Sequence, residues 1–381
     1  MKKPLRADPI VVDFETHAIE PRPHYPPKPV SVAIGNYDFG KGKRENRFFA
    51  WGHPTGNNCT EKQARVILAK VWKDSRSKLF HNAKFDLDVA ETHLDLPWLP
   101  WEQVHDTLFL AFLTNPHRAK LNLKDLANEE CGMAPTERDA VKEWILENVP
   151  EAKPKSWGAF ICRAPGELVG KYAIGDVTRP IALFKKLHPD VLKRGMGEAY
   201  DRERRLLAPL VDTERRGIRV NLGKLKTDAV LYSKAVEDAD AAIRKLLKAP
   251  DLDVGSAPQL ADALDNAKMV DAWILTAKGN RSTAKKNLEK VIDNKDAFQL
   301  LVYRGALDAY LSHFIRPWLK QALETEGVVH TTWNQVRQDY HGQGARDVGA
   351  RTGRLSSTPN FQNIPKVFED SEVAEKLEGF K

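Results

Sequence analysis

One short stretch near the start of the chain decides the fold: Ile10-Val11-Val12-Asp13-Phe14-Glu15-Thr16. Its β-branched residues run together, which predicts a buried strand from Pro9 to Phe14. Side chains alternate along a strand, so Asp13 and Glu15 are expected to point to the same face. Two acids that share one face of a buried strand are unfavourable unless a cation lies between them. A hard metal ion held by oxygen ligands would meet that need. The alternative is a pair of strand-end acids that faces water.

Around this strand, the first half of the chain shows the periodicities of a mixed α/β domain. Strands are expected at 30–34, 47–51 and 78–80, and helices at 61–73, 84–92, 106–113, 123–130 and 167–187. A proline-rich loop is expected over 21–29. Strands that come first and then mix with helices predict a mixed sheet with helices around it.

The second half of the chain has mainly helical patterns. A domain boundary is expected near 188–196, where proline, glycine and charged residues gather. The helix over 203–216 should end at Gly217, a common C-terminal stop. The apolar stripe of the long helix over 222–248 is interpreted as core packing. Further helices are predicted at 257–264, 283–292, 295–303 and 307–322, and a strand at 328–335.

Two further segments carry acids in patterns that fit a metal-binding or catalytic site. Asp86 follows His81 and Asn82 at a strand-to-helix junction, where the helix dipole favours a carboxylate. Asp86 is interpreted either as an acid of a metal site or as an ordinary acid at the start of a helix. His81 is interpreted as a hydrogen-bonded structural residue rather than a metal ligand. Tyr172 and Asp176 are four apart on one predicted helix, so their side chains share a face. The alternative is an aromatic and an acid on a helix surface.

Composition limits the class of protein without naming it. The chain has 381 residues, which suggests two or three domains, and a net charge of +7, which favours polyanionic partners. Cys59, Cys131 and Cys162 lie far apart and have no metal-ligand spacing, a pattern that fits reduced thiols and a cytoplasmic location. No run of 18 apolar residues occurs, so no membrane partner is expected.

The ordered combination Asp-x-Glu, Asn-x-x-x-Phe-Asp and Tyr-x-x-x-Asp resembles the 3′→5′ proofreading exonuclease domain of family A DNA polymerases, the bacterial polymerase I type. Segments 105–107 and 121–127 also resemble this family. Lys171 stands where a sister group has histidine, so the tyrosine subclass fits. The resemblance implies an α/β, ribonuclease-H-like exonuclease domain at 1–192. A mainly helical thumb and the beginning of the palm would follow at 193–381.

The resemblance also implies a mechanism. Asp13, Glu15 and Asp176 would hold two Mg²⁺ or Mn²⁺ ions about 3.5–4 Å apart, with Asp86 in the outer shell. Tyr172 and Glu15 would orient the attacking water toward the terminal phosphate of a single-stranded 3′ DNA end. Asn82 would support the site and contact the DNA, and Ile19 would wedge against the terminal base.

A second set of residues resembles the polymerase region of the same family. Segment 203–221 is similar to its opening, and segment 351–365 is similar to the place where the palm begins and touches the primer–template duplex. The expected DNA contacts there are Arg351, Thr352, Arg354, Gln362 and Asn363. The alternative is a polar surface loop.

The family's next motif, which supplies the first polymerase metal aspartate, does not occur before Lys381. The chain is therefore expected to be incomplete for polymerisation, with a separate palm-and-fingers chain as a candidate partner and a phage as a candidate source. Two other functions are kept open. One is a non-catalytic DNA-binding or assembly subunit of a split polymerase. The other is an RNA-trimming exonuclease, which segment 352–365 disfavours.

Overall fold

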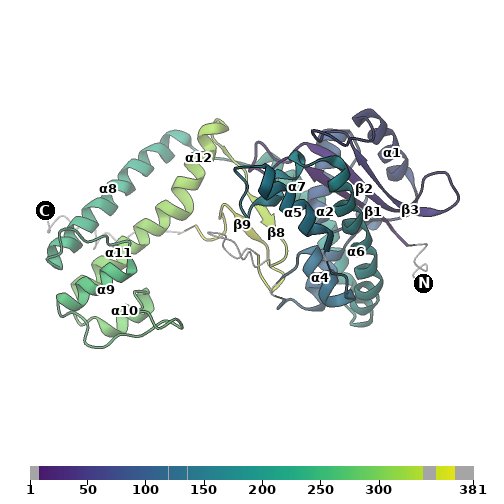
Figure 1. Ribbon diagram of the computed structural model, residues 1–381. Coiled ribbons are helices and arrows are strands. Elements are labelled where there is room, and N and C mark those ends of the chain that lie inside the picture. The colour runs from purple at the N-terminus through teal and green to yellow at the C-terminus, as the bar shows by residue number, and fades with distance from the viewer. Residues whose placement is uncertain (1–7, 119, 135, 338–348, 365–381) are drawn as a thin grey trace. The chain divides into compact units, whose positions relative to one another are not determined.

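A computed structural model describes residues 8–118, 120–134, 136–337 and 349–364. The chain divides into two compact units (Figure 1). The first unit comprises Met1–Arg216 with Thr332–Thr358, and the second comprises Gly217–Thr331 with Pro359–Lys381. Within the described residues, no helix combines the length and the apolar character that a membrane crossing requires.

The first unit is built on a five-stranded sheet in the order β3-β2-β1-β4-β5. The strands are β1 (Ile10–Thr16), β2 (Pro29–Asp38), β3 (Arg44–Ala50), β4 (Lys78–Phe80) and β5 (Val104–Asp106). β1 pairs antiparallel with β2 and parallel with β4, while β2–β3 is antiparallel and β4–β5 parallel. The mixed α/β, ribonuclease-H-like fold class predicted from the sequence is confirmed, with β1 at the centre of the sheet.

Helices surround this sheet, and all of them except the one at Thr136–Asn148 contribute buried residues to its core. They are α1 (Glu61–Lys73), α2 (Ala83–Leu94), α3 (Thr107–Thr114), α4 (Leu123–Cys131), α5 (Thr136–Asn148), α6 (Gly166–Lys193) and α7 (Gly197–Arg216). The 3₁₀ turns η1 (Trp101–Gln103) and η2 (Trp157–Arg163) connect them. A hairpin of β8 (Thr332–Asn334) and β9 (Ser356–Thr358) completes the unit.

The long helix α6 crosses the sheet closely enough to reach β1. A Cβ on Gly35 of β2 would lie 2.9 Å from the Val177 Cβ of α6, a separation that real side chains avoid. Glycine therefore permits the helix to lie against the strand. Val177 is the neighbour of Asp176, so this close approach brings an α6 acid to the strand that carries Asp13 and Glu15.

The first compact unit continues past the segment 188–196, where the sequence predicts a domain boundary. Residues 188–193 of that segment complete α6, and residues 194–196 form the short turn to α7. His188 and Val191 of α6 are buried, as are Tyr200 and Leu207 of α7, and Val191, Tyr200 and Leu207 belong to one hydrophobic core. α7 therefore packs with the sheet, and the compact unit continues to Arg216. Gly217 follows with φ +64°, as expected for a helix-ending glycine.

The second unit is mainly helical. It contains α8 (Leu222–Leu246), α9 (Ala257–Asn266), α10 (Lys285–Val291), α11 (Lys295–Tyr310), the π-helical turn η3 (Leu311–Ile315) and α12 (Arg316–Glu324). α8 packs along α11, η3 and α12 (Figure 1). A two-stranded ribbon of β6 (Ile218–Arg219) and β7 (Val328–Val329) joins its ends.

Two element predictions in this half were wrong. The predicted strand 328–335 is two strands, because β7 pairs with β6 in the second unit whereas β8 pairs with β9 in the first. The predicted helices 295–303 and 307–322 form one continuous helical run through Gly305. The burial of Leu300, Leu307 and Leu311 on that run offsets the weak helix preference of glycine.

Candidate active site

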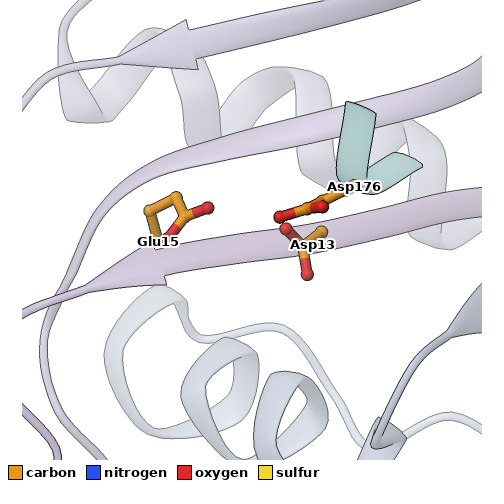
Figure 2. Close-up of side chains that lie close together, drawn as sticks. All are labelled: Asp13, Glu15 and Asp176. Atoms are coloured by element: carbon orange, nitrogen blue, oxygen red, sulfur yellow. The ribbon is translucent and has the colours of Figure 1, made fainter. Parts of the chain in front are cut away.

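Three carboxylates converge from β1 and α6. Asp13, Glu15 and Asp176 each offer an oxygen, and these oxygens all lie within 4.8 Å of one another (Figure 2). The alternation along β1 points Asp13 and Glu15 to one face, as predicted, and α6 supplies the third acid. Within the described residues, no second group of three acidic, histidine or cysteine ligands comes this close.

The electrostatics of this cluster are unfavourable without added positive charge. Burial, followed by the negative charge of Asp176, raises the pKa of Asp13 to about 7, against an opposing effect of Lys124. Burial also raises the pKa of Glu15, and the charges of Asp13 and Asp176 add to that rise. A set of oxygen donors that repel one another fits a hard divalent cation such as Mg²⁺ or Mn²⁺. The residues present therefore suit the metal that the fold implies.

Asp86 of α2 contacts the backbone of β1. Its Oδ1 accepts a hydrogen bond of 3.1 Å from the backbone N–H of Phe14, the residue between the two β1 acids. Burial raises its pKa, Asp13 adds to the rise, and the Phe14 hydrogen bond opposes it. Asp86 is not part of the group of three oxygens within 4.8 Å. Its position suits a group that supports β1 rather than one that shares an ion directly.

Asn82 and His81 occupy the turn before α2. Asn82 is exposed and has φ +77°, and its backbone N–H donates to Asp106 Oδ1 at 3.0 Å. His81 Nε2 donates to the Leu121 carbonyl at 2.9 Å, and burial lowers the pKa of His81 to about 4. The neutral, hydrogen-bonded imidazole agrees with the structural role expected for His81.

Asp106 organises this turn, although the sequence singled it out only as part of a family-like segment. It begins α3 as the N-cap and accepts backbone hydrogen bonds from Asn82, Ala83 and Leu108. Burial raises its pKa to about 6, against the effect of those hydrogen bonds. It thereby ties the start of α2, the helix of Asp86, to the sheet edge. An acid at the start of a predicted helix, as Asp106 is in the helix expected at 106–113, is the sequence signal for such an N-cap.

Tyr172 and Asp176 share one face of α6, as their spacing predicted, and a lysine contacts both. Lys124 Nζ of α4 lies 2.6 Å from Asp176 Oδ2 and 3.7 Å from the centroid of the Tyr172 ring. Arg179 Nη1 lies 3.4 Å from the other Asp176 oxygen. Sequence reasoning missed both cations. The available signal was a lysine in the buried stripe of an amphipathic helix, beside Leu123 and Ala127.

Ile19 is 66% exposed in the loop after β1. The same loop is held to α2 by Arg22, which pairs with the fully buried carboxylate of Asp88. An exposed apolar side chain on a fixed loop is compatible with a contact to a nucleotide base, and the assignment of Ile19 stays a prediction.

The predicted DNA contacts of the second half fall in two places. Arg351, Thr352 and Arg354 are exposed in the first unit, on the segment that leads into β9. Gln362 and Asn363 are exposed in the second unit, where their backbone N–H groups donate to Asn360 Oδ1 at 2.9 and 3.2 Å. Pro365, the last residue of the family-like segment, lies outside the described residues.

Comparison with known proteins agrees with this architecture. A family model described as 3′-5′ exonuclease matches residues 1–192, and one described as DNA polymerase family A matches residues 223–377. The chain is 27% identical over 322 residues to DNA polymerase DpoZ of Acinetobacter phage SH-Ab 15497, which covers 80% of this chain and 49% of that protein. It is 26% identical over 308 residues to DNA polymerase DpoZ of Vibrio phage phiVC8, covering 75% of this chain and 46% of the relative.

More distant similarity extends to bacterial polymerases. The thermostable DNA polymerase I of Thermus filiformis is 27% identical over 185 residues, which is 48% of this chain and 21% of that enzyme. A solved structure of the POL domain of Pol1 from M. smegmatis, in complex with DNA primer-template and dNTP, superposes with a TM-score of 0.64 and 21% identity. That match covers 95% of this chain and 53% of the other, and it supports the fold.

The chain thus spans about half the length of the phage relatives that it matches. One family model covers its first half and the other most of the remainder. The chain belongs to the family A DNA polymerases, of which it carries the 3′-5′ exonuclease domain and part of the polymerase region.

Proposed function

We propose that the first unit removes nucleotides from the 3′ end of single-stranded DNA by divalent-metal-dependent hydrolysis. The observation that supports this most directly is the convergence of Asp13, Glu15 and Asp176 within 4.8 Å. The raised pKa values of Asp13 and Glu15 indicate a site in which ionised acids need a positive partner. Such an arrangement has no evident use in the packing of the sheet.

The three acids would hold two Mg²⁺ or Mn²⁺ ions, and Asp86 would support them through the β1 backbone. When bound, the ions would lower the pKa of a water and stabilise the charge that develops on the phosphodiester oxygens. The chain's own groups would do the rest. Tyr172 would orient the water, with help from Glu15, and Asn82 and Ile19 would contact the terminal nucleotide.

Residues 193–381, which include the β8–β9 segment of the first unit, would bind the primer–template duplex. Arg351, Thr352 and Arg354 would meet the phosphates, and Gln362 and Asn363 would offer hydrogen bonds. This proposal assigns residues 193–381 to the thumb and the beginning of the palm. A separate chain with the remaining palm and fingers is a candidate partner in DNA synthesis.

The decisive experiment is degradation of a 3′-labelled single strand with added Mg²⁺ or Mn²⁺, on wild type, Asp13→Ala and Asp176→Ala. Each substitution should lower the rate of cleavage by about a thousandfold or more, because each removes a ligand of the metal ions. Binding of the strand, measured by fluorescence anisotropy, should change little, because phosphate contacts by basic residues dominate affinity. An exposed acid, Glu198, gives the control Glu198→Ala, which should cleave as wild type does.

Equal and poor digestion by wild type and Asp13→Ala would contradict the nuclease proposal. It would favour the alternative of a non-catalytic DNA-binding or assembly subunit. Loss of DNA binding in step with cleavage would contradict the assignment of the acids to chemistry. An RNA strand of the same sequence, degraded faster than the DNA strand, would instead support the RNA-trimming alternative.

A further inference from the structure

The cation that faces the acid cluster belongs to the chain itself. Lys124 stands in the first turn of α4, which begins at the N-cap Asn122, and only 8% of the residue is exposed. Lysine is rarely buried to this degree unless it has an ionic partner. Here the partner is Asp176, at 2.6 Å from Nζ to Oδ2.

Lys124 touches both residues of the Tyr-x-x-x-Asp pair. Its ammonium lies 3.7 Å from the centroid of the Tyr172 ring, within the range of a favourable cation–π contact. One buried group thus fixes the direction of the Asp176 carboxylate and the place of the Tyr172 ring. The ring is also held by the edge of Trp157, with centroids 6.2 Å apart.

The charge of Lys124 acts on the other two acids as well. Burial raises the pKa values of Asp13 and Glu15, and the positive charge of Lys124 opposes that rise in both. Formally, the ammonium offsets one of the three negative charges of the ionised acids, and Arg179, 3.4 Å from the other Asp176 oxygen, offsets a second. The ammonium therefore relieves part of the repulsion that a divalent cation would also relieve.

We propose that Lys124 is a positioning residue that shares Asp176 with the divalent cation and thereby sets the affinity of the acid cluster for metal. The inference rests on the proposed function, because it assigns the metal to these acids. Two cations that approach one carboxylate repel each other, so each metal-binding event works against the Lys124 charge. Removal of that charge tightens metal binding and, in the absence of metal, increases the repulsion among the acids, although Arg179 still lies beside Asp176.

The test is Mn²⁺ binding to the full chain, followed by electron paramagnetic resonance of free Mn²⁺ and by thermal unfolding in EDTA and in Mn²⁺. The variants are Lys124→Met, which removes the charge at similar volume, and Lys124→Gln, which keeps a hydrogen-bond donor. Lys124→Arg keeps the charge. The matched control is Lys171→Met, because Lys171 is exposed on α6 directly beside Tyr172.

We expect Lys124→Met and Lys124→Gln to lower the dissociation constant for Mn²⁺ by about tenfold. Both should unfold at a lower temperature than wild type in EDTA and recover most of that loss in Mn²⁺. Lys124→Arg should bind Mn²⁺ with close to the wild-type affinity, and Lys171→Met should match wild type in both measurements.

Unchanged or weaker Mn²⁺ binding in either folded neutral variant overturns the inference, and Lys124→Gln decides if Lys124→Met does not fold. A lower unfolding temperature that Mn²⁺ does not restore also overturns it, because it shows a purely structural lysine. A failure of the proposed function is distinguishable, because wild type itself would then bind no Mn²⁺ at the acid cluster.

Discussion

At the scale of single residues, the site combines groups whose charges oppose one another. Asp13 is flanked by Glu15 along β1 and faces Asp176 across the gap to α6. Its burial and the charge of Asp176 favour the protonated form, and Lys124 only partly opposes them. The folded protein therefore stores an electrostatic penalty whenever these acids are ionised without a metal, and that penalty must depend on pH.

The sign of this dependence follows from the pKa of Asp13. The folded group holds its proton up to pH about 7, whereas the ordinary value for an aspartate is 3.8. Between these values the folded state binds more protons than the unfolded state, so stability falls as pH rises through the window. In EDTA, the free energy of unfolding should decrease from pH 5 to pH 8, with about 2 kcal/mol contributed by Asp13 after allowance for its partial exposure.

Urea unfolding at several pH values, on wild type and Asp13→Asn, measures this effect. The variant cannot ionise at this position, so it should show a shallower slope and exceed wild type in stability at pH 8 in EDTA. Saturating Mg²⁺ should flatten the wild-type slope, because the ion stabilises the ionised acids. Equal slopes for the two proteins in EDTA would mean that Asp13 ionises normally.

The sequence predicted some of these residues and not others, for physical reasons. Asp13 and Glu15 share a face because strand alternation is local, and Tyr172 and Asp176 share one because helix periodicity is local. The contact of Lys124 with Asp176 joins residues 52 positions apart. The sequence places Lys124 in the apolar stripe of a predicted helix, but no local periodicity encodes which acid it contacts.

At the scale of elements, the loop between β1 and β2 is held by ionic contacts with α2 and α7. Arg22 donates a hydrogen bond of 3.0 Å to the Tyr25 carbonyl, and it forms an ion pair with Asp88, which is fully buried. Arg215 of α7 also pairs with Asp88, at 2.5 Å, and with Glu91 at 2.5 Å. Helix α7 and the loop that carries Ile19 therefore both form an ion pair with the buried carboxylate of Asp88.

Loss of Arg22 should loosen this loop and destabilise the first unit. In Arg22→Ala, Asp88 keeps Arg215 but loses one of its two cationic partners inside the protein. We expect a decrease of about 2–3 kcal/mol in the free energy of unfolding. Amide hydrogen exchange over residues 17–28 should also become faster.

The matched control is Arg205→Ala, because Arg205 is about half exposed and pairs with Glu198 at 3.4 Å. It should change stability by less than about 0.5 kcal/mol. If Arg22→Ala were as mild as this control, the Arg22–Asp88 pair would not hold the loop.

The predicted elements succeeded where one pattern governed one segment. The central strand, the helix at 61–73 and the long helix of the second half all formed close to their expected bounds. The strand expected at 328–335 did not, because its two ends pair with partners in different units. Which strand a segment pairs with is a property of the whole fold and is not contained in its own periodicity.

At the scale of the whole molecule, the chain consists of two compact units, and the family models divide it at different residues. The exonuclease family model ends at residue 192 and the polymerase model begins at residue 223. Helix α7 lies between these limits and packs with the first unit. The β8–β9 hairpin returns to that unit and is fixed there, since the Trp333 N–H donates to Glu214 of α7 at 2.7 Å.

Because the hairpin belongs to the first unit, the segment before β9 that carries Arg351 and Arg354 also lies on that unit. The predicted DNA contact of Arg354 can be tested directly. Arg354 is exposed one residue after Gly353, which has φ +71°. The chain as a whole carries a net charge of +7, so loss of one charge should hardly change long-range attraction. If Arg354 binds a phosphate, Arg354→Ala should instead remove one specific counterion-releasing contact.

The expected result is weaker binding of a primer–template duplex, by a similar factor for different sequences. The slope of log affinity against log salt should also fall by about one. Anisotropy titrations at several salt concentrations measure both quantities. Arg44→Ala, at an exposed position on β3, controls for the general loss of positive charge and should leave the slope unchanged. If the salt dependence of binding has the same slope in Arg354→Ala and in wild type, Arg354 does not contact a phosphate, even if the affinity changes. The reason is that counterion release depends on direct contact with phosphates and not on the net charge of the protein.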